Sequence, residues 1–207
     1  MASEYQLQDY DNVLIVEGYS DLVFYKEVLK LLGKDRSVFI KEMKGKSNLT
    51  TKLDAFITPQ LLAEKTSVGV IVDADANAQG TFTSIQTVLK DLTAQDISLP
   101  GVWTAGAPKV GVFITPDANS SGELETLVWR AWAANATNAQ SKTCVENYIQ
   151  CMKSIGHEAH SPDKGLVSAL LAIRNDEDPR PGPGARENIF DLNHPEYSQL
   201  REFLSFF

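Results

Sequence analysis

Short apolar runs alternate with helical patterns along the first two-thirds of the chain. Asn12–Val16 predicts a buried strand, and Ser67–Val72 is a fully apolar run typical of a central parallel strand. Further strands are predicted over 37–43, 102–104 and 110–114. Helices are predicted from a cap at Ser20 to Gly33, after KGKSN to about residue 64, and over 81–93 and 122–134. This alternation predicts an α/β fold, a mostly parallel sheet flanked by helices.

After about residue 134 the patterns become helical. One apolar stripe, interpreted as a face packed on the core, contains Val145, Tyr148, Ile149, Met152 and Ile155. A helix is expected over 163–173 with Asp163 in its first turn, a Pro/Gly-rich charged loop over 175–188, and a final amphipathic piece with Leu200, Phe203, Leu204 and Phe207. We therefore expect a domain over 1–134 and a helical C-terminal extension over 135–207, packed on the same core.

Composition limits the class of protein. With 207 residues, 43% of them hydrophobic and 22% charged, the chain suits one sizeable globular domain with an appended piece. No apolar stretch approaches the ~20 residues of a membrane span, and MASEYQLQDYD lacks the features of a secretory signal. Cys144 and Cys151 are about two helical turns apart, beyond disulfide reach. We expect a cytoplasmic protein with no membrane partner, in which the reduced thiols pack as small hydrophobic groups.

Acidic residues follow three of the predicted strands, in the pairs Glu17/Asp21, Asp73/Asp75 and Glu123/Glu125. The carboxyl ends of parallel strands lie at one edge of the sheet, so these side chains can converge although they are distant in sequence. Clustered carboxylates repel one another unless a cation lies among them. Hard divalent cations such as Mg²⁺ bind carboxylate oxygens, water and phosphate.

Each acidic residue alone has a structural explanation. Asp21 suits a helix N-terminus, and the Asp-x-Asp pair suits a turn after a strand. Glu123 lies three residues after Ser120, the spacing of a capping box, so we assign it a structural role. Glu125 lies off the apolar stripe of its helix, and capping does not explain it. The combination predicts a metal site at the sheet edge.

The segments VEGYSD, IVDAD and GELE, in this order, resemble the Toprim domain of topoisomerases, primases and OLD-type nucleases. That domain has a Rossmann-like sheet, a glutamate after its first strand and a DxD motif after a later hydrophobic strand. Asp21 and Glu125 resemble the OLD-like branch, and VGVFITPDANSSGELETL is similar to a group of small stand-alone Toprim proteins. The resemblance covers about residues 12–134.

The resemblance implies a nuclease that hydrolyses phosphodiester bonds of DNA or RNA, in genome defence or nucleic-acid processing. It implies Mg²⁺ or Mn²⁺ as cofactor, Glu17 and Asp73 as catalytic residues, and a metal-ligand set of Glu17, Asp21, Asp73, Asp75 and Glu125. OLD-like nucleases also carry a lysine in a helical part beyond the acidic motifs. Lys164, in SPDKGLVSALLAI, matches it and would offset charge on the scissile phosphate as a third catalytic residue.

Two alternative functions match parts of the sequence. VFIKEMKGKSNL resembles the phosphate-binding loop of NTPases, but Ile40 occupies the position of the first glycine, and we reject this interpretation. Lys44 and Lys46 are still candidates for contact with a substrate phosphate. The second alternative is a non-catalytic metal- or nucleic-acid-binding partner of a separately encoded ABC-type ATPase, because stand-alone relatives of OLD nucleases lack the ATPase half.

The net charge of −8 argues against a nucleic-acid partner, because phosphate binding favours a basic surface. Bound cations would offset the five proposed ligands. The remaining charges then permit a modest phosphate track, for which the candidates are Lys41, Lys44, Lys46, Lys52, Arg174, Arg180 and Arg186.

Overall fold

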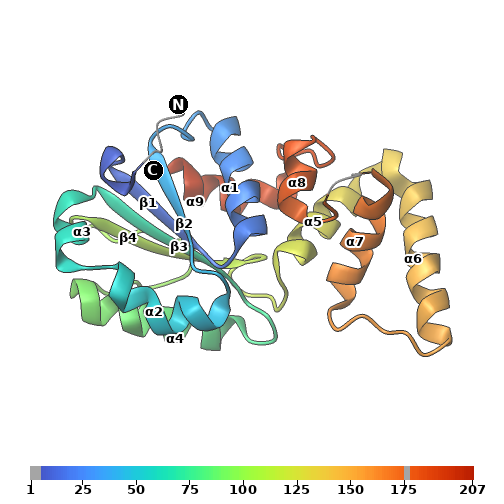
Figure 1. Cartoon of the computed structure of the whole chain (residues 1–207), viewed down its shortest axis with the longest axis horizontal. Coiled ribbons are helices and arrows are strands. Elements are labelled where there is room, and N and C mark those ends of the chain that lie inside the picture. The colour runs from blue at the N-terminus through green and yellow to red at the C-terminus, as the bar shows by residue number, and fades with distance from the viewer. Residues whose placement is uncertain (1–5, 175–177) are drawn as a thin grey trace.

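The computed structural model describes residues 6–174 and 178–207 and has a four-stranded sheet in which every strand is parallel to its neighbours (Figure 1). The strand order is β2-β1-β3-β4. The strands are β1 (Asn12–Val16), β2 (Val38–Glu42), β3 (Ser67–Asp73) and β4 (Lys109–Thr115). The predicted α/β class is confirmed, and the strands predicted over 12–16, 37–43 and 67–72 all form.

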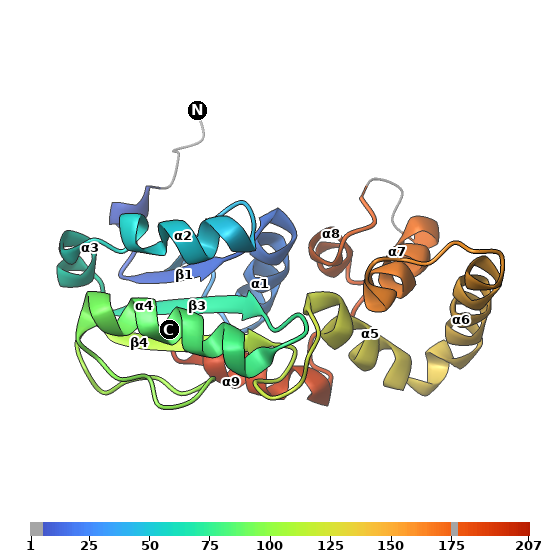
Figure 2. The same cartoon turned by 90° about the horizontal axis from the view of Figure 1, so that it is seen from below.

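Helices cover both faces of the sheet (Figures 1 and 2). One face packs against α1 (Tyr19–Leu31) and α9 (Ser198–Ser205), and the other against α2 (Lys46–Phe56), α3 (Pro59–Glu64) and α4 (Ala78–Thr93). Successive strand residues point to opposite faces, so Leu14 and Val16 join one apolar cluster while Val13 and Ile15 join the other. The continuous apolar run of β1 is therefore buried on both sides.

The remaining helices lie beyond the carboxyl ends of the strands (Figure 2). They are α5 (Leu124–Ala134), α6 (Ala139–Ser154), α7 (Pro162–Arg174) and α8 (Pro181–Arg186). Short 3₁₀ helices span Leu7–Asp9, Ala136–Asn138 and Pro195–Tyr197. Within the two described ranges no helix is long and apolar enough to cross a membrane. Both cysteines are free, as expected, but both are exposed, so the prediction that they pack as small hydrophobic residues is wrong.

The helix α9 packs on the sheet where two glycines lie side by side. Gly69 of β3 pairs with Gly111 of β4. A Cβ at Gly69 would lie 2.7 Å from the Phe207 ring, and one at Gly111 would lie 2.8 Å from the Trp103 ring. The ring of Phe203 stacks on Trp103 with centroids 4.8 Å apart. The predicted amphipathic end of the chain is confirmed, since Leu200, Phe203, Leu204 and Phe207 are all buried.

Three predicted boundaries in the sheet domain are wrong. The helix predicted to begin at a Ser20 cap is capped by Gly18, and the one predicted to end near residue 64 is two helices, because Thr58 caps a new helix with Pro59 in its first turn. Residues 102–104 are not a strand. Trp103 makes only an isolated bridge to Gly111, and its indole N–H donates to the Phe203 carbonyl at 3.2 Å.

The apolar stripe predicted to face the core on α6 is largely exposed, which corrects that interpretation. Only Val145 is buried, whereas Tyr148 is 55% and Ile155 is 64% exposed. The helix α6 packs against α7 and the adjacent 3₁₀ turn and does not reach the sheet (Figure 2). The apolar pattern identified the helix correctly, but not the face that is buried.

The Pro/Gly-rich segment predicted to be a loop contains a buried helix. Residues 175–177 lie outside the described part, but Pro181–Arg186 form α8, in which all residues before Arg186 are buried. Proline is favourable in the first turn of a helix because its missing N–H has no partner there. The glycines are required by close packing, since a Cβ at Gly182 would lie 2.3 Å from the Ser20 carbonyl oxygen.

Candidate acidic site at the carboxyl end of the sheet

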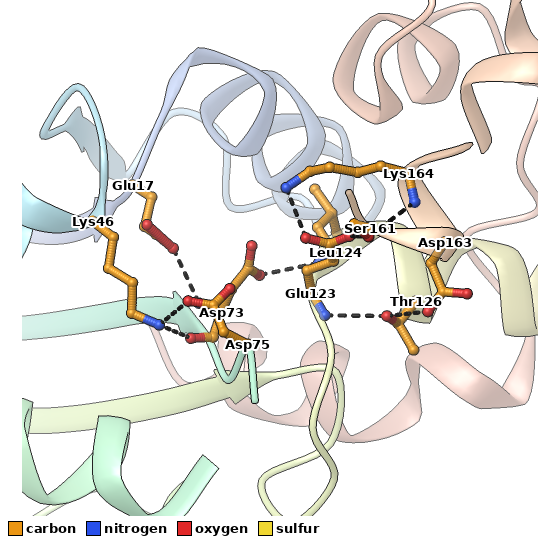
Figure 3. Close-up of polar contacts among 10 residues, drawn as sticks. All are labelled: Glu17, Lys46, Asp73, Asp75, Glu123, Leu124, Thr126, Ser161, Asp163 and Lys164. Atoms are coloured by element: carbon orange, nitrogen blue, oxygen red, sulfur yellow. Dashed lines mark hydrogen bonds and ion pairs between the residues drawn. The ribbon is translucent and has the colours of Figure 1, made fainter. Parts of the chain in front are cut away.

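Three chain segments bring carboxylates to one edge of the sheet (Figure 3). Glu17 directly follows β1, Asp73 is the last residue of β3, and Glu125 lies in the first turn of α5. A two-way backbone bridge ties the segment after β3 to the one before α5, since Asp75 N donates to Gly122 O at 2.8 Å and Gly122 N to Asp75 O at 2.7 Å. The topology thus gathers residues that are far apart in sequence.

Asp73 is bonded to both neighbouring segments. Its N–H donates to Glu17 Oε2 at 3.3 Å, and its own Oδ1 accepts from Leu124 N at 3.0 Å (Figure 3). The second bond places the carboxylate of Asp73 at the N-terminus of α5, where exposed N–H groups favour negative charge. Asp73 therefore connects the end of β1 to the start of α5.

Asp21 caps α1 and also belongs to the acidic cluster. Its Oδ2 accepts from Gly18 N at 3.1 Å, so the capping explanation is correct as far as it goes. Burial raises the pKa of Asp21 to about 7, and the charges of Glu17 and Glu125 add to the increase. An aspartate that only caps an exposed helix has no such charged neighbours. Asp21 therefore both caps α1 and interacts with the carboxylates of the site.

The other carboxylates at this edge are perturbed in the same direction. Burial raises the pKa of Asp73 well above its usual range, and the charges of Asp21, Glu17 and Glu125 raise it further. Burial also raises the pKa of Glu17, against the Asp73 N–H and the Lys46 charge, and that of Glu125, against the Lys164 charge. The site therefore holds more negative charge than the protein compensates.

Two lysines approach the acidic residues from opposite sides (Figure 3). Lys46, at the start of α2, forms an ion pair with Asp75, and its amine donates to the Asp73 carbonyl at 2.9 Å and the Thr81 hydroxyl at 3.4 Å. Asp75 is exposed and has a positive φ of 50°. Lys46 thus joins α2 to the turn after β3, a role that sequence reasoning did not assign to it.

Lys164 lies on the other side, in the first turn of α7. Its Nζ is 2.7 Å from Glu123 Oε2, and the Ser161 hydroxyl donates to the other carboxylate oxygen. The charges of Glu125, Glu123 and Asp73 raise the pKa of Lys164 against the opposing effect of burial. The structure therefore brings Lys164 to the carboxylates although 91 positions of the sequence separate it from Asp73.

The capping box predicted for Ser120 and Glu123 is wrong. Glu123 is itself the N-cap of α5, and its N–H donates to Thr126 Oγ1 at 3.1 Å. Ser120 instead belongs to a turn in which its N–H donates to Asp117 Oδ1 at 2.8 Å. The Glu123 carboxylate is free to bind Ser161 and Lys164 because the cap is made by the backbone and Thr126.

A second contact beside this pair joins α5 to α7. The Thr126 hydroxyl donates to Asp163 Oδ2 at 2.6 Å (Figure 3). Together with the Glu123 contacts, it fixes the first turn of α7 against the first turn of α5.

A buried tyrosine lies near the same edge, where Tyr25 OH and Thr115 Oγ1 are 3.1 Å apart. Burial and the charges of Asp21 and Asp73 raise the pKa of Tyr25 well above its usual range.

Three residues of the predicted basic track contact groups outside the acidic site. Lys41 lies over the Phe56 ring, Arg180 lies over the Tyr19 ring, and Arg186 pairs with Glu187. Of the seven residues proposed for it, only Lys46 makes a described contact with one of the predicted metal ligands. A lysine that opens a helix after the second strand is the sequence signal for this position, because that helix starts at the same sheet edge.

The chemistry of the donor set fits a hard divalent cation. The predicted ligands offer only carboxylate oxygens, and burial, with the charges of neighbouring carboxylates, raises the pKa values of Asp21 and Asp73. In the described ranges, no group of three or more His, Cys, Asp or Glu is already arranged to hold a metal. The carboxylates instead face other partners: Glu17 the Asp73 N–H, Asp73 the Leu124 N–H, and Asp75 Lys46.

Comparison with known proteins identifies a family but no function. The family model described as a protein of unknown function, DUF3226, matches residues 11–207, and the chain belongs to this family. Searches of curated proteins and of solved structures find no significant match. The function is therefore inferred from the chemistry of the site.

Proposed function

We propose that the protein is a divalent-metal-dependent nuclease that hydrolyses phosphodiester bonds of nucleic acid. The observation that carries the proposal is the crowding of Glu17, Asp21, Asp73 and Glu125 from separate segments at one sheet edge. Carboxylates that raise one another's pKa values destabilise the fold, and strongly perturbed groups cluster at functional sites. The open carboxyl edge of a parallel sheet is also where α/β proteins bind ligands.

Mg²⁺ or Mn²⁺ would be held by residues of the set Glu17, Asp21, Asp73, Asp75 and Glu125, which offers the oxygen donors that both ions bind. When bound, such a cation offsets charge on a phosphate and activates water for attack. The sequence resemblance to Toprim nucleases names the same residues. A turn or a helix cap explains one carboxylate at a time and does not require four carboxylates from separate segments at one sheet edge.

The residues of the chain would supply position and charge. The hydrogen bond from Asp73 N to Glu17 and the one from Leu124 N to Asp73 hold the two carboxylates in a fixed relation. Lys164, protonated beside Glu123 and Glu125, would stabilise negative charge on the substrate phosphate. Lys46 would hold the Asp75 turn, and its exchange between Asp75 and a substrate phosphate would permit entry of both metal and substrate.

The test is a cleavage assay with single- and double-stranded DNA and RNA, in Mg²⁺, Mn²⁺ or a chelator. Cation-dependent cleavage that is lost in Asp73→Asn supports the proposal. Asp54→Asn, which changes an exposed aspartate of α2 outside the acidic cluster, is the matched control and should cleave normally. Cation-dependent binding without cleavage would instead support the non-catalytic partner of a separate ABC-type ATPase. If the protein neither binds nor cleaves any of these substrates, both proposed functions are contradicted.

A further inference from the structure

A residue with an exposed aromatic ring lies, in the sequence, between two residues of the acidic site. Tyr19 is the first residue of α1, and it is two positions from both Glu17 and Asp21. The side chain of Asp21 turns back to Gly18 N, and Glu17 accepts from Asp73 N, so both lie at the site. Tyr19 is 49% exposed and belongs to neither apolar cluster. Its ring is therefore not part of the core.

A cation is held over this ring by a third residue. The guanidinium carbon of Arg180 lies 5.3 Å from the centroid of the Tyr19 ring. Asp178 fixes the plane of the guanidinium through two hydrogen bonds, Nε to Oδ1 at 2.7 Å and Nη2 to Oδ2 at 2.5 Å. Such a two-point contact restricts rotation of the arginine. The flat cation and the flat ring are thus arranged in advance of any ligand.

Contacts between α8 and α1 fix the positions of Tyr19 and Arg180 relative to the acidic site. Gly182 N donates to Ser20 Oγ at 3.2 Å, and a Cβ at Gly182 would clash with the Ser20 carbonyl. The helix α8 therefore lies directly on the first turn of α1, beside it in both views (Figures 1 and 2). Because Tyr19 and Asp21 share that turn, a group bound by Tyr19 and Arg180 has a fixed relation to the carboxylates.

We propose that Tyr19 and Arg180 form a stacking site for an unpaired base, so that the substrate is single-stranded nucleic acid; this inference rests on the proposed nuclease function. Aromatic and arginine side chains bind any base through its flat face, independently of sequence. Bases inside a duplex are already stacked and cannot reach such a site. An acidic chain with a net charge of −8 gains little from phosphate contacts, and stacking on a base would supply binding energy that does not depend on phosphate charge.

The competing explanation is that the pair only holds α8 on α1. The two explanations predict different results for Tyr19→Leu. A leucine keeps apolar bulk but loses the aromatic face. If the pair only packs, this change lowers the melting temperature and leaves nucleic-acid binding as it was. If it binds a base, binding falls while Tyr19→Trp, which keeps an aromatic face, restores it.

The binding experiment uses fluorescence anisotropy with a labelled single strand, the same strand containing abasic sites, and a duplex, in an Asp73→Asn background that prevents cleavage. Removing the aromatic face by Tyr19→Leu should weaken single-strand binding roughly 5- to 150-fold, the range measured for one stacked base. The parent should bind the abasic strand more weakly than the normal one, and Tyr19→Leu should lose that difference. Tyr148→Leu, on the distant α6 with a similarly exposed ring, should bind like the parent.

Two results overturn the inference: equal binding of normal and abasic strands by the parent, or unchanged single-strand binding by a folded Tyr19→Leu protein. A cleavage assay of the chain with Asp73 intact distinguishes failure of the stacking site from failure of the nuclease proposal. If that chain cleaves single strands and Tyr19→Leu cleaves them with the same KM, only the stacking site is wrong. If the parent binds bases through Tyr19 and the intact chain never cleaves, the stacking site stands and the nuclease proposal fails.

Discussion

Glu123 and Lys164 form an ion pair that joins the cap of α5 to the first turn of α7, with Lys164 Nζ 2.7 Å from Glu123 Oε2. The Glu123 side chain is 8% exposed, and Ser161 donates to its other carboxylate oxygen. A buried carboxylate that loses one partner keeps its desolvation cost without compensation. The pair therefore fixes the position of Lys164. The negative charges of Glu125 and Asp73 raise the pKa of this lysine.

Glu123→Gln should lower both stability and activity. Losing the charged hydrogen bonds should cost about 1–2 kcal/mol, or roughly 2–8 °C in melting temperature for a chain of this size. Solvent weakens the pair because the Lys164 side chain is half exposed, so larger losses are not expected. Cleavage should fall because Lys164 loses its orientation. Thermal melts and initial rates of Glu123→Gln, Lys164→Met and the double variant give the coupling between the two residues.

The control for this cycle is the surface pair of Lys90 and Asp96, six positions apart and 3.2 Å between charged atoms. Asp96→Asn should change stability by less than about 0.5 kcal/mol, because exposed pairs contribute little. Additive effects of the Glu123 and Lys164 changes would contradict a direct interaction, since residues in contact normally couple by at least about 0.5 kcal/mol.

Asp73→Asn should abolish cleavage without unfolding the protein. Loss of a metal ligand should lower the rate by several orders of magnitude, on the order of 10³-fold or more. In a chelator its melting temperature should equal or exceed that of the wild type, because a crowded cluster loses one repelling charge. In saturating Mn²⁺ the wild type should gain stability and Asp73→Asn should not. An equal gain in both proteins would place the cation elsewhere.

Metal-free protein should lose stability as the pH rises from about 4 to 7. The pKa of Asp21 is raised to about 7 by burial and by the charges of Glu17 and Glu125, whereas an aspartate in an unfolded chain titrates near 3.9. The folded state holds this proton more tightly, so its contribution to stability is complete below about pH 4 and is lost as the pH passes about 7. Melting temperatures in a chelator across this range measure the slope.

Asp21→Asn should have a shallower slope over the same pH range, and Asp96→Asn, which changes an exposed aspartate, should keep the slope of the wild type. Some slope will persist in Asp21→Asn because the pKa of Asp73 is raised as well. A slope that is identical in Asp21→Asn and the wild type would show that Asp21 does not hold the proton.

Gly182→Ala should destabilise the protein because the new methyl group would lie 2.3 Å from the Ser20 carbonyl oxygen and 2.8 Å from the Val23 side chain. Backbone must move to relieve this clash, and such overpacking typically costs about 1–3 kcal/mol. Thermal or urea unfolding measures the loss. A stability equal to that of the wild type would mean that α8 does not sit on α1 as described.

Local patterns predicted the sheet well where burial is symmetrical. The run Asn12–Val16 needs apolar residues on both faces, so pattern and structure agree residue by residue. The patterns failed where tertiary contacts decide the outcome. Residues 181–185 contain two prolines and two glycines, which locally favour a loop, yet close packing on α1 makes them a helix. The stripe on α6 shows the reverse case, an apolar pattern with little to cover it.

The acidic site was predictable in part for a similar reason. A residue at the end of a parallel strand has a known edge, so Glu17 and Asp73 could be grouped without coordinates. The partner of Glu123 could not, because it lies 41 positions along the chain and depends on how α7 docks. Ser120 also has the right spacing for a capping box, but a turn anchored by Asp117 removes it from that role. The spacing of Ser120 and Glu123 fits both a capping box and the observed turn, so spacing alone could not distinguish them.

The two facing glycines of β3 and β4 have a consequence for synthesis of the protein on the ribosome. The indole N–H of Trp103 donates to the carbonyl of Phe203, 100 residues further along the chain. Phe203 belongs to α9, the helix that packs over Gly69 and Gly111. At about 5–20 residues per second, the emerging strands wait roughly 5–20 s for that helix. During this interval a bare apolar face is open to chaperones and to other nascent chains.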